Sequence, residues 1–401
     1  MAKNKQDKRP NVPPLRFPEF TEPWEPSTLQ EIAEFSKGTG ISKEQRSETG
    51  LPCILYGELY TTYSNEVIED VVSRTDLDPT DLVKSQSNDV IIPSSGETAE
   101  DIATARCVTD DNVLLGGDIN IIRLNEPHDG RFMSYQLNGI RKYDIAKIAQ
   151  GVSVVHLYSN ELKKMSVSLP QSAEQKKIAN FLGLLDRRIV IQSKLIEQLE
   201  SLIKGITLQA SKTNDCEMVM VSDILTERNE VNTAHHEVCS VSVSQGVVNQ
   251  VEFLGHSFAA KDISNYNVVH YGDLIYTKSP TGDFPYGIVK RSSQENLVAV
   301  SPLYGVYIPA SNDIGCFLHY FFCNAVSAKN YLHKLIQKGA KNTINITNQR
   351  FLENTINLPK AEKLAQVVAL LNCLSEKKQQ AENLLVLLNK QKQFFLNQMF
   401  I

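Results

Sequence analysis

The sequence lacks any apolar run near the ~20 residues that a membrane-spanning helix requires. Residues 1–9 are charged and contain no apolar stretch of the kind found in signal peptides. The 7 cysteines are odd in number, scattered, and never spaced as Cys-x-x-Cys, which argues against a disulfide framework and against a zinc site. These absences predict a protein of the reducing cytoplasm that has no membrane partner.

Motifs of catalysis are also missing. No Gly-x-x-x-x-Gly-Lys-Ser/Thr phosphate loop and no His-Glu-x-x-His motif occurs. The Asn-Pro-Pro-Phe/Tyr motif of an adenine methyltransferase is approached only by Asn11–Pro14, where Val12 interrupts it. Glu161–Lys163 and Glu174–Lys176 fit the short half of a nuclease motif, but no matching Pro-Asp lies upstream. The sequence therefore predicts no enzyme, metal site or cofactor site in this chain.

The composition is that of a folded, globular protein. With 401 residues, 42% hydrophobic and 22% charged, the chain is long enough for two or more domains. The formal net charge of -5 gives no general nucleic-acid signal. DNA binding would therefore depend on local basic surfaces or on a basic partner.

The sequence contains an internal repeat of two long helical segments. Leu169–Pro170 and Leu358–Pro359 lie 189 residues apart, and a helical segment follows each pair. The first has an apolar seam at steps of three, four or seven, with Gln192 in its one gap: Ile178, Leu182, Leu185, Ile189, Ile196, Leu199, Ile203 and Ile206. Adding 189 to these numbers gives the corresponding positions of the second segment, with Ala381 at the gap. They are Val367, Leu371, Leu374, Lys378, Leu385, Leu388, Lys392 and Phe395. This spacing is typical of a coiled coil and predicts two helices, each about 57 Å long, that pack antiparallel.

Short β-type runs lie ahead of each helical segment, between Gly, Ser and Asp turns. They are Cys53–Tyr56, Ile119–Leu124, Cys239–Val243 and Leu303–Ile308. In addition, Asp89–Ser95 resembles Asp273–Ser279. The predicted fold class is α+β: two mixed, mostly β domains, separated by two long helices that form an antiparallel coiled coil, with an internal pseudo-twofold repeat. An ordinary bundle with both domains folded onto it is the alternative.

Two phrases resemble the specificity (S) subunits of Type I restriction-modification enzymes. The opening Asn11–Phe20, followed by Trp24-Glu25, is similar to the usual start of that family, and Leu169–Asp186 resembles the start of its central helix. The second copy of the helix phrase departs from the pattern, with Leu364 and Ser375 at the places of Gln175 and Asp186. The resemblance covers nearly the whole chain.

The resemblance implies the following organisation: an N-terminal arm (1–20), a first target-recognition domain (21–170), a central long helix (171–212), a second target-recognition domain (213–359) and a C-terminal long helix (360–401). Each domain would read one half of a split double-stranded DNA site. The helices would set the spacing and dock two methyltransferase (M) subunits, which restriction (R) subunits then join. S-adenosylmethionine, magnesium and ATP would be bound by those partners, with no cofactor in this non-catalytic chain.

Several loops carry the side chains that DNA recognition needs, namely cations and hydroxyls for phosphates and amides for base edges. They are Lys37–Lys43 with Arg46, Ser94–Thr98 and its counterpart Lys278–Gly282, Lys147–His156, and Lys338–Asn345. The candidate DNA-contacting residues are Lys37, Thr39, Ser42, Lys43, Arg46, Ser94, Ser95, Thr98, Lys147, Ser153, Lys278, Ser279, Thr281, Lys341, Asn342 and Asn345. The same residue types also mark ordinary solvated turns.

Two other functions remain open. A non-catalytic coiled-coil adaptor that binds only proteins would explain the helices but not the paired polar loops. A self-sufficient methyltransferase or nuclease would require the motifs that are missing. Salt-dependent DNA binding by the methyltransferase complex separates the first alternative from a DNA reader, and an assay of the purified chain with S-adenosylmethionine and DNA tests the second.

Overall fold

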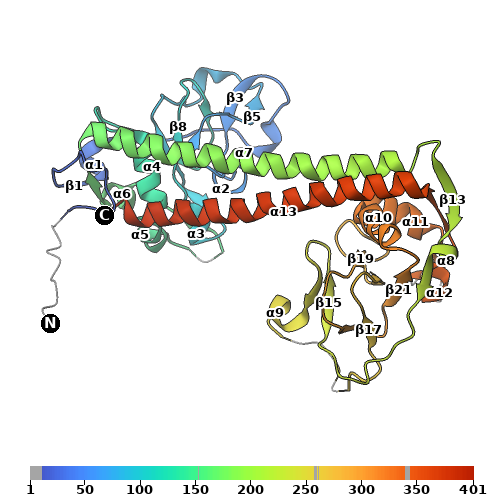
Figure 1. Ribbon diagram of the computed structural model, residues 1–401. Coiled ribbons are helices and arrows are strands. Elements are labelled where there is room, and N and C mark those ends of the chain that lie inside the picture. Colours follow the sequence, from blue (N-terminus) through green and yellow to red (C-terminus); the bar gives the residue numbers. More distant parts are fainter. Residues whose placement is uncertain (1–10, 152, 257–259, 261, 339–343) are drawn as a thin grey trace, which may run out of the picture. The chain divides into compact units, whose positions relative to one another are not determined.

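The computed structural model describes residues 11–151, 153–256, 260, 262–338 and 344–401, and the chain divides into two compact units (Figure 1). Unit 1 lies within residues 1–193 and 383–401, and unit 2 comprises residues 194–382. Both long helices therefore contribute to both units. Across the described ranges, no helix combines the length and the apolar character needed to cross a membrane.

The two long helices are α7 (Ser172–Ala210) and α13 (Ala361–Gln398). Each begins two residues after a proline, Pro170 or Pro359, because proline cannot continue a preceding helix but tolerates a helix start. Their bounds lie close to the predicted segments 171–212 and 360–401. All residues of the predicted seam are buried or half-buried, which confirms two long helices with an apolar stripe.

Unit 1 is built on a five-stranded sheet with the strand order β2-β10-β6-β8-β4. All neighbouring strands are antiparallel except β4, which runs parallel to β8. The run Val90–Ile92 is fully buried, as expected of a central strand covered on both faces. The strands of this sheet are β2 (Ala33–Lys37), β4 (Val67–Ile68), β6 (Val90–Pro93), β8 (Arg106–Val108) and β10 (Ile119–Leu124).

The remaining elements of unit 1 surround this sheet. A second sheet has the order β5-β3-β9, and β1 pairs with β12 and β7 with β11. The strands are β1 (Glu25–Thr28), β3 (Leu51–Ile54), β5 (Ser73–Thr75), β7 (Ser95–Gly96), β9 (Leu114–Leu115), β11 (Val155–His156) and β12 (Ser166–Leu169). The helices are α1 (Leu29–Ile32), α2 (Glu58–Thr61), α3 (Ala99–Ile102), α4 (Gly130–Asn138), α5 (Lys142–Ile148) and α6 (Ser159–Lys163), with 3-10 turns η1 (Lys43–Gln45) and η2 (Pro79–Asp81).

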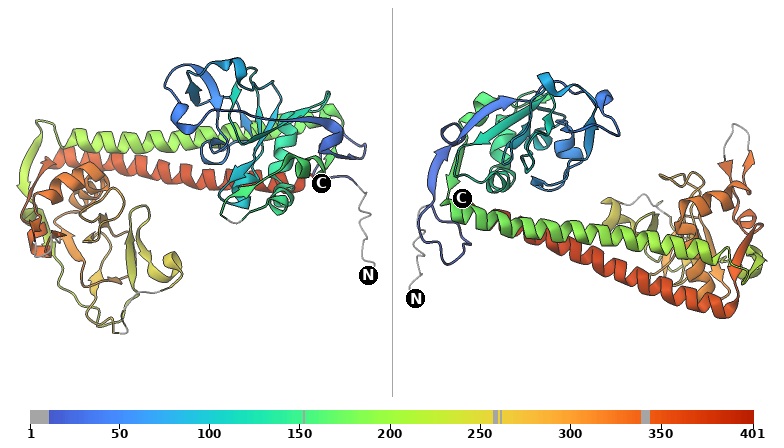
Figure 2. Two further views of the ribbon diagram at one scale, coloured as in Figure 1. Left: turned by 180° about the vertical axis from the view of Figure 1, so that it is seen from behind. Right: turned by 90° about the horizontal axis from the view of Figure 1, so that it is seen from above.

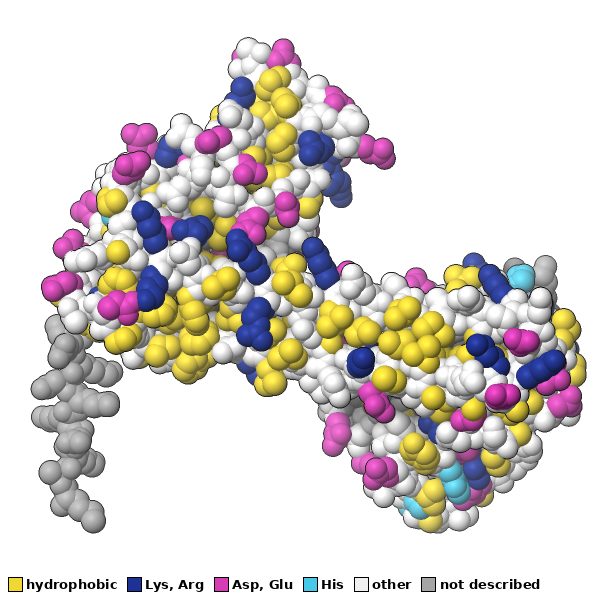
Figure 3. Space-filling view, turned by 45° about the horizontal axis from the view of Figure 1, so that its top comes forward, with side chains coloured by type: hydrophobic (Ala, Val, Ile, Leu, Met, Phe, Trp, Pro, Cys, Tyr) yellow, Lys and Arg dark blue, Asp and Glu magenta, His cyan; other side chains and the backbone are white. Residues whose placement is uncertain are grey.

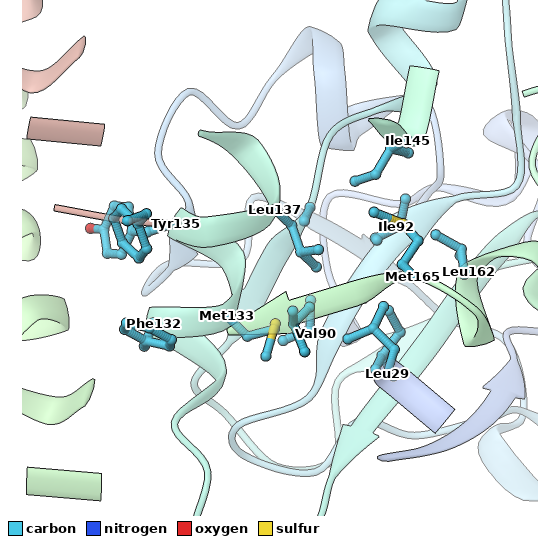
Figure 4. Close-up of a cluster of buried hydrophobic side chains, with 14 of the residues drawn as sticks. Leu29, Val90, Ile92, Phe132, Met133, Tyr135, Leu137, Ile145, Leu162 and Met165 are labelled. Atoms are coloured by element: carbon cyan, nitrogen blue, oxygen red, sulfur yellow. The ribbon is translucent and has the colours of Figure 1, made fainter. Parts of the chain in front are cut away.

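The main core of unit 1 lies between the sheet and its helices (Figure 4). It also takes in the end of α13 and the residues after it. The rings of Trp24 and Phe132 have their centroids 6.3 Å and 5.3 Å from that of Phe400. Leu396 and Met399 are buried in the same cluster. The last turn of the chain is therefore part of the core of the N-terminal domain, a long-range contact that the sequence pattern does not reveal.

A buried polar cluster joins α7 and α13 within unit 1. Lys392 Nζ on α13 lies 2.5 Å from Glu66 Oε2 and 2.7 Å from Asp186 Oδ1 on α7. Tyr135 donates its hydroxyl to Asp186 Oδ2 at 2.6 Å. Both views of Figure 2 show the first part of α7 (green) beside the last part of α13 (red). Lys392 is thus a paired charge at a seam position, not a gap in the seam.

Unit 2 is built on a four-stranded antiparallel sheet with the order β14-β21-β18-β19. Smaller pairs are β13-β24, β15-β16, β17-β20 and β22-β23. The strands are β13 (Cys216–Met220), β14 (Leu225–Glu227), β15 (Cys239–Ser242), β16 (Gly246–Asn249), β17 (Asn267–Val269), β18 (Leu274–Tyr276), β19 (Val289–Arg291), β20 (Val298–Val300), β21 (Gly305–Pro309), β22 (Gln337–Lys338), β23 (Ile344–Asn345) and β24 (Thr355–Pro359). The helices are α8 (Val221–Ile224), α9 (Gln250–Leu254), α10 (Asn312–Cys323), α11 (Ala325–His333) and α12 (Asn348–Phe351).

The two units repeat one topology. The order β2-β10-β6-β8 of unit 1 corresponds to β14-β21-β18-β19 of unit 2, with antiparallel neighbours throughout. The entering strand pairs with the strand that precedes the long helix in both cases, β1 with β12 and β13 with β24. One backbone hydrogen bond also recurs at equivalent places in the two units. In unit 1 Leu29 N–H donates to Met165 O, and in unit 2 Val221 N–H donates to Asn354 O. The repeat predicted from the helices therefore extends to the domains ahead of them, within a mixed α+β fold.

Candidate nucleic-acid interface

The polar loops gather at one edge of each main sheet. In unit 1, Lys37 at the end of β2 pairs with Asn120 near the start of β10, and Pro93 at the end of β6 pairs with Ile119. In unit 2, Tyr276 at the end of β18 pairs with Gly305 at the start of β21. The segments after β2, β6 and β18 thus leave the sheets at equivalent edges.

The loop from Lys37 to Arg46 is held by its glycines and by one apolar anchor. A Cβ on Gly38 would lie 2.0 Å from the carbonyl oxygen of Gly116, and Gly40 has a φ of +60°. Ile41 is buried against a small cluster, so the residues that follow it are turned outward. Lys37, Thr39, Ser42 and Lys43 are exposed.

A hollow of about 830 Å³ opens beside this loop. Its lining includes Lys43, Arg46, Tyr56, Thr61 and Thr62. Arg46 Nη1 lies 3.4 Å from Glu58 Oε1, and the buried Glu58 also accepts a hydrogen bond from Leu55 N–H at 2.9 Å. The hollow offers cations, hydroxyls and an aromatic ring, the groups that contact phosphates and bases.

The second loop of unit 1 is less open. Ser94 and Ser95 are buried, and the Ser95 hydroxyl lies 3.2 Å from His156 Nδ1. Thr98 caps α3 by accepting from Asp101 N–H at 3.1 Å. The burial of Ser94 and Ser95, and the helix-capping role of the exposed Thr98, leave these hydroxyls less open to DNA than those of the loop that begins at Lys37.

Lys147 and Ser153 lie in the third segment of unit 1, and both are exposed. Lys147 Nζ sits 4.2 Å from the centroid of the Tyr143 ring. The segment returns to the same sheet edge, because Leu157 N–H donates to Ser94 O at 3.0 Å and Asn120 Nδ2 donates to Leu157 O at 2.9 Å. The structure therefore brings the three predicted segments of unit 1 to one edge.

In unit 2 the loop after β18 presents Lys278, Ser279 and Thr281. Lys278 is half-buried and the other two are exposed. Burial lowers the pKa of Lys278, while Glu227 acts in the opposite direction. Backbone bonds between Thr281 and Phe284 close the turn at 3.1 Å and 2.9 Å, and buried Phe284 fixes it to the core.

The last predicted segment is only partly described. Lys341 and Asn342 lie outside the described residues, and Asn345 belongs to β23, which pairs with β22. The segment just after it reaches the same edge of the sheet. Asn348 Nδ2 donates to Glu227 Oε1 at 2.8 Å, and its carbonyl oxygen accepts from Tyr307 Oη at 2.8 Å.

Sequence reasoning missed Tyr56, Thr61 and Thr62, which line the hollow. The available signal was Gly57 directly after the β-type run Cys53–Tyr56, a place where chains commonly turn. Basic side chains lie among acidic ones on the face shown in Figure 3 and do not form one uniform patch. In the described parts of the chain, no group of three or more His, Cys, Asp or Glu side chains is placed to hold a metal ion.

Two copies of one α+β topology, each with polar loops at an equivalent sheet edge and each followed by a long helix, define a protein of two repeated domains. Residues 21–201 match the family model described as "Type I restriction modification DNA specificity domain". The match spans 181 of the 401 residues, so over the first domain and most of α7 the chain is similar to this DNA specificity domain. No curated protein matches the sequence significantly.

Solved structures have the same fold over nearly the whole chain. The Type I restriction-modification system S subunit from M. genitalium is similar with a TM-score of 0.61 and 14% identity, covering 97% of this chain and 99% of that chain. A chain described under complex assembly and conformational transition of the type I R-M system is similar with a TM-score of 0.51 and 14% identity, covering 95% and 98%. At this identity, the likeness shows the fold alone.

Proposed function

We propose that this protein is the DNA-reading subunit of a Type I restriction-modification enzyme, in which each domain reads one half of a bipartite site. The observation that carries the proposal is the duplication of the loop-bearing sheet edge. One site would need one such edge, whereas two copies that differ in their loops suit a split, asymmetric target. The chain itself would be non-catalytic, and S-adenosylmethionine, magnesium and ATP would be bound by partner subunits.

The helices would form the spacer as an antiparallel coiled coil. Two ion pairs link α7 and α13, one within each unit: Asp186 with Lys392, and Glu200 with Lys378. In each ion pair the two residue numbers add up to 578. Along antiparallel helices the residue number rises on one helix as it falls on the other, so facing residues keep a constant sum, whereas facing residues of parallel helices do not. Combined with the repeat offset of 189, this sum supports a pseudo-twofold axis, whose centre would lie between Lys194 and Leu195 on α7 and between Asn383 and Leu384 on α13. The centre falls within two residues of the division between the units.

A helix of 39 residues is about 58 Å long. Half-sites one turn of DNA apart lie roughly 34 Å from centre to centre. A rigid pair of such helices is therefore long enough to hold two readers at a fixed separation.

The helices also carry an apolar surface suited to partner docking. Seven exposed apolar side chains each stand one residue before a seam residue, and an eighth, Ile191, stands one residue before Gln192 in the gap. The seven are Leu184, Leu195, Leu202, Leu370, Leu384, Leu387 and Phe394. The pseudo-twofold axis would run perpendicular to the plane that contains the two antiparallel helices. Rotation about this axis exchanges the helices but leaves each side chain on the same side of that plane. The exposed apolar side chains of both helices would therefore lie on one face of the pair. Exposed apolar surface of this kind typically marks an interaction site, and we assign it to helices of the two methyltransferase subunits, which restriction subunits would then join.

Lysine substitutions test the DNA-reading role. Lys43→Ala and Lys278→Ala should each weaken double-stranded DNA binding by the complex with methyltransferase subunits. Each should also reduce the slope of log K against log salt by about 0.9 for a lost phosphate contact. Fluorescence anisotropy over a salt series measures both quantities.

The matched control is Lys390→Ala, an exposed lysine on α13, which should leave affinity and slope unchanged. If Lys43→Ala and Lys278→Ala also bind like the unmodified complex, the loops are ordinary turns. A complex that binds no DNA under any of these conditions would favour the protein-only adaptor.

A further inference from the structure

Three nucleophilic or titratable side chains meet in unit 2, and the proposed DNA-reading role uses none of them. Lys290 Nζ donates to Cys323 Sγ at 3.2 Å, and His319 Nε2 lies 3.7 Å from the same sulfur. Lys290 belongs to β19, while His319 and Cys323 lie one turn apart at the end of α10. The cluster therefore bridges a helix and a strand of the domain core.

The tautomer of His319 follows from its other hydrogen bond. Arg291 N–H donates to His319 Nδ1 at 3.2 Å, and a nitrogen that accepts a hydrogen bond carries no proton. In the neutral ring the proton is then on Nε2, which faces Cys323. Two N–H donors thus converge on one sulfur atom, an arrangement that stabilises a thiolate.

The charges at the sulfur agree with this geometry. Burial by itself raises the pKa of Cys323, but His319 and Lys290 outweigh it and lower the pKa to about 6. The C-terminal end of a helix disfavours negative charge, so the two donors are what favour the thiolate. By contrast, burial raises the pKa of Cys53 and of Cys239 to about 11.

The partial exposure of Cys323 is a further property that it shares with reactive cysteines. Cys323 is half-buried, whereas Cys53, Cys107, Cys239 and Cys316 are buried. Reactive cysteines typically lie in electropositive, partly exposed surroundings. Part of the Cys323 residue is thus exposed to solvent, while the 7% exposure of Lys290 keeps the amine in place beside the sulfur.

We propose that Cys323 is a peroxide-reactive modification site at which oxidation joins its sulfur to Nζ of Lys290. The thiolate attacks one peroxide oxygen, the O–O bond breaks, and the departing hydroxide takes a proton from the Lys290 ammonium as water. The resulting sulfenic acid is then attacked by the neutral amine, the S–O bond breaks, and a second water leaves. The sulfur loses two electrons to one hydrogen peroxide, and the S–N bond ties the end of α10 to β19.

Peptide mass spectrometry of the full chain tests this site. One equivalent of hydrogen peroxide should give a cross-linked peptide pair joining residues 290 and 323, lighter than the two free peptides by two hydrogen atoms and separated again by a thiol reductant. Cys323 should react on the order of tenfold faster than the exposed Cys373.

Lys290→Met, which preserves length without an amine, should abolish the cross-link and leave a sulfenic acid at Cys323 that dimedone traps. Cys323→Ser should abolish both products. Oxidation of Cys373 with Cys323 unchanged would overturn the proposal, as would oxidation of Cys323 in the unmodified chain without any bond to Lys290. If Lys290→Met does not fold, the cross-linked peptide of the unmodified chain decides alone. DNA binding is not part of this readout, so its outcome is independent of the proposed function.

Discussion

Lys392→Met should destabilise the protein by about 3–5 kcal/mol, because it removes a cation that is ion-paired with two buried carboxylates. Glu66 and Asp186 are 6% and 3% exposed, and without Lys392 each faces a like charge in a poorly solvated site. Arg106 is near enough to interact with both, but its guanidinium donates to the carbonyl oxygens of Leu59 and Tyr63. Urea unfolding followed by circular dichroism measures the loss.

The effect should depend on pH with a definite sign. Burial and Glu66 raise the pKa of Asp186, while Lys392 lowers it, so removing Lys392 raises that pKa further. An acid whose pKa is raised by folding binds its proton more tightly in the native state, so stability falls as pH rises. The deficit of Lys392→Met should therefore be largest at pH 8 and shrink toward pH 5.

The control is Lys390→Met, an exposed lysine two residues earlier on the same helix. A surface substitution of this kind should change stability by no more than about 0.5 kcal/mol. Equal losses for the two variants, or a Lys392→Met deficit that does not vary with pH, would show that the cluster is not the buried charge network described here.

Inserting four residues between Ser193 and Lys194 should lengthen the gap between the DNA half-sites by one or two base pairs. The insertion adds about 6 Å, roughly one helical turn, and DNA rises about 3.4 Å per base pair. Four residues form a stutter, so the seam should unwind locally and not be lost. The half-site sequences should stay the same, because neither domain is changed.

The ion pairs between the helices give this experiment its control. An insertion in α7 alone displaces Glu200 by one turn from Lys378, while Asp186 and Lys392 keep their partners. A second insertion of four residues between Glu382 and Asn383 restores the common register. The double insertion should keep the longer gap and recover thermal stability. Full activity with an unchanged gap would mean that the helices do not set the distance.

The long helices and the central strands could be predicted because their information is local. The seam repeats every few residues. Val90–Ile92 is entirely apolar, Ile119–Leu124 is apolar at four of its six positions, and both runs are rich in β-branched residues, which favours buried strands. In the sequence of α13 alone, Lys378 and Lys392 interrupt the series of apolar residues that forms the seam. Their carboxylate partners lie on the other helix, which the pattern of one helix does not reveal.

Contacts between distant residues could not be predicted. Nothing local to Phe400 indicates that it packs against Trp24. The Ser94-Ser95-Gly96 run has the composition of an exposed turn, yet all three residues are buried because β7 pairs with β11 across the sheet edge. Loop composition thus located the edge of the sheet, while the exposure of each side chain depended on tertiary packing.

Mapping methylated adenines across a genome tests most directly whether each domain reads its own half of the target. Arg46→Ala with Thr61→Ala alters only the hollow of unit 1, and Ser279→Ala with Thr281→Ala alters only the loop of unit 2. The first pair should relax or change base preferences in one half of the methylated motif, and the second pair should do so in the other half, with the gap unchanged. Changes in the same half for both pairs, or a motif without two separated halves, would contradict a protein that reads DNA with two domains.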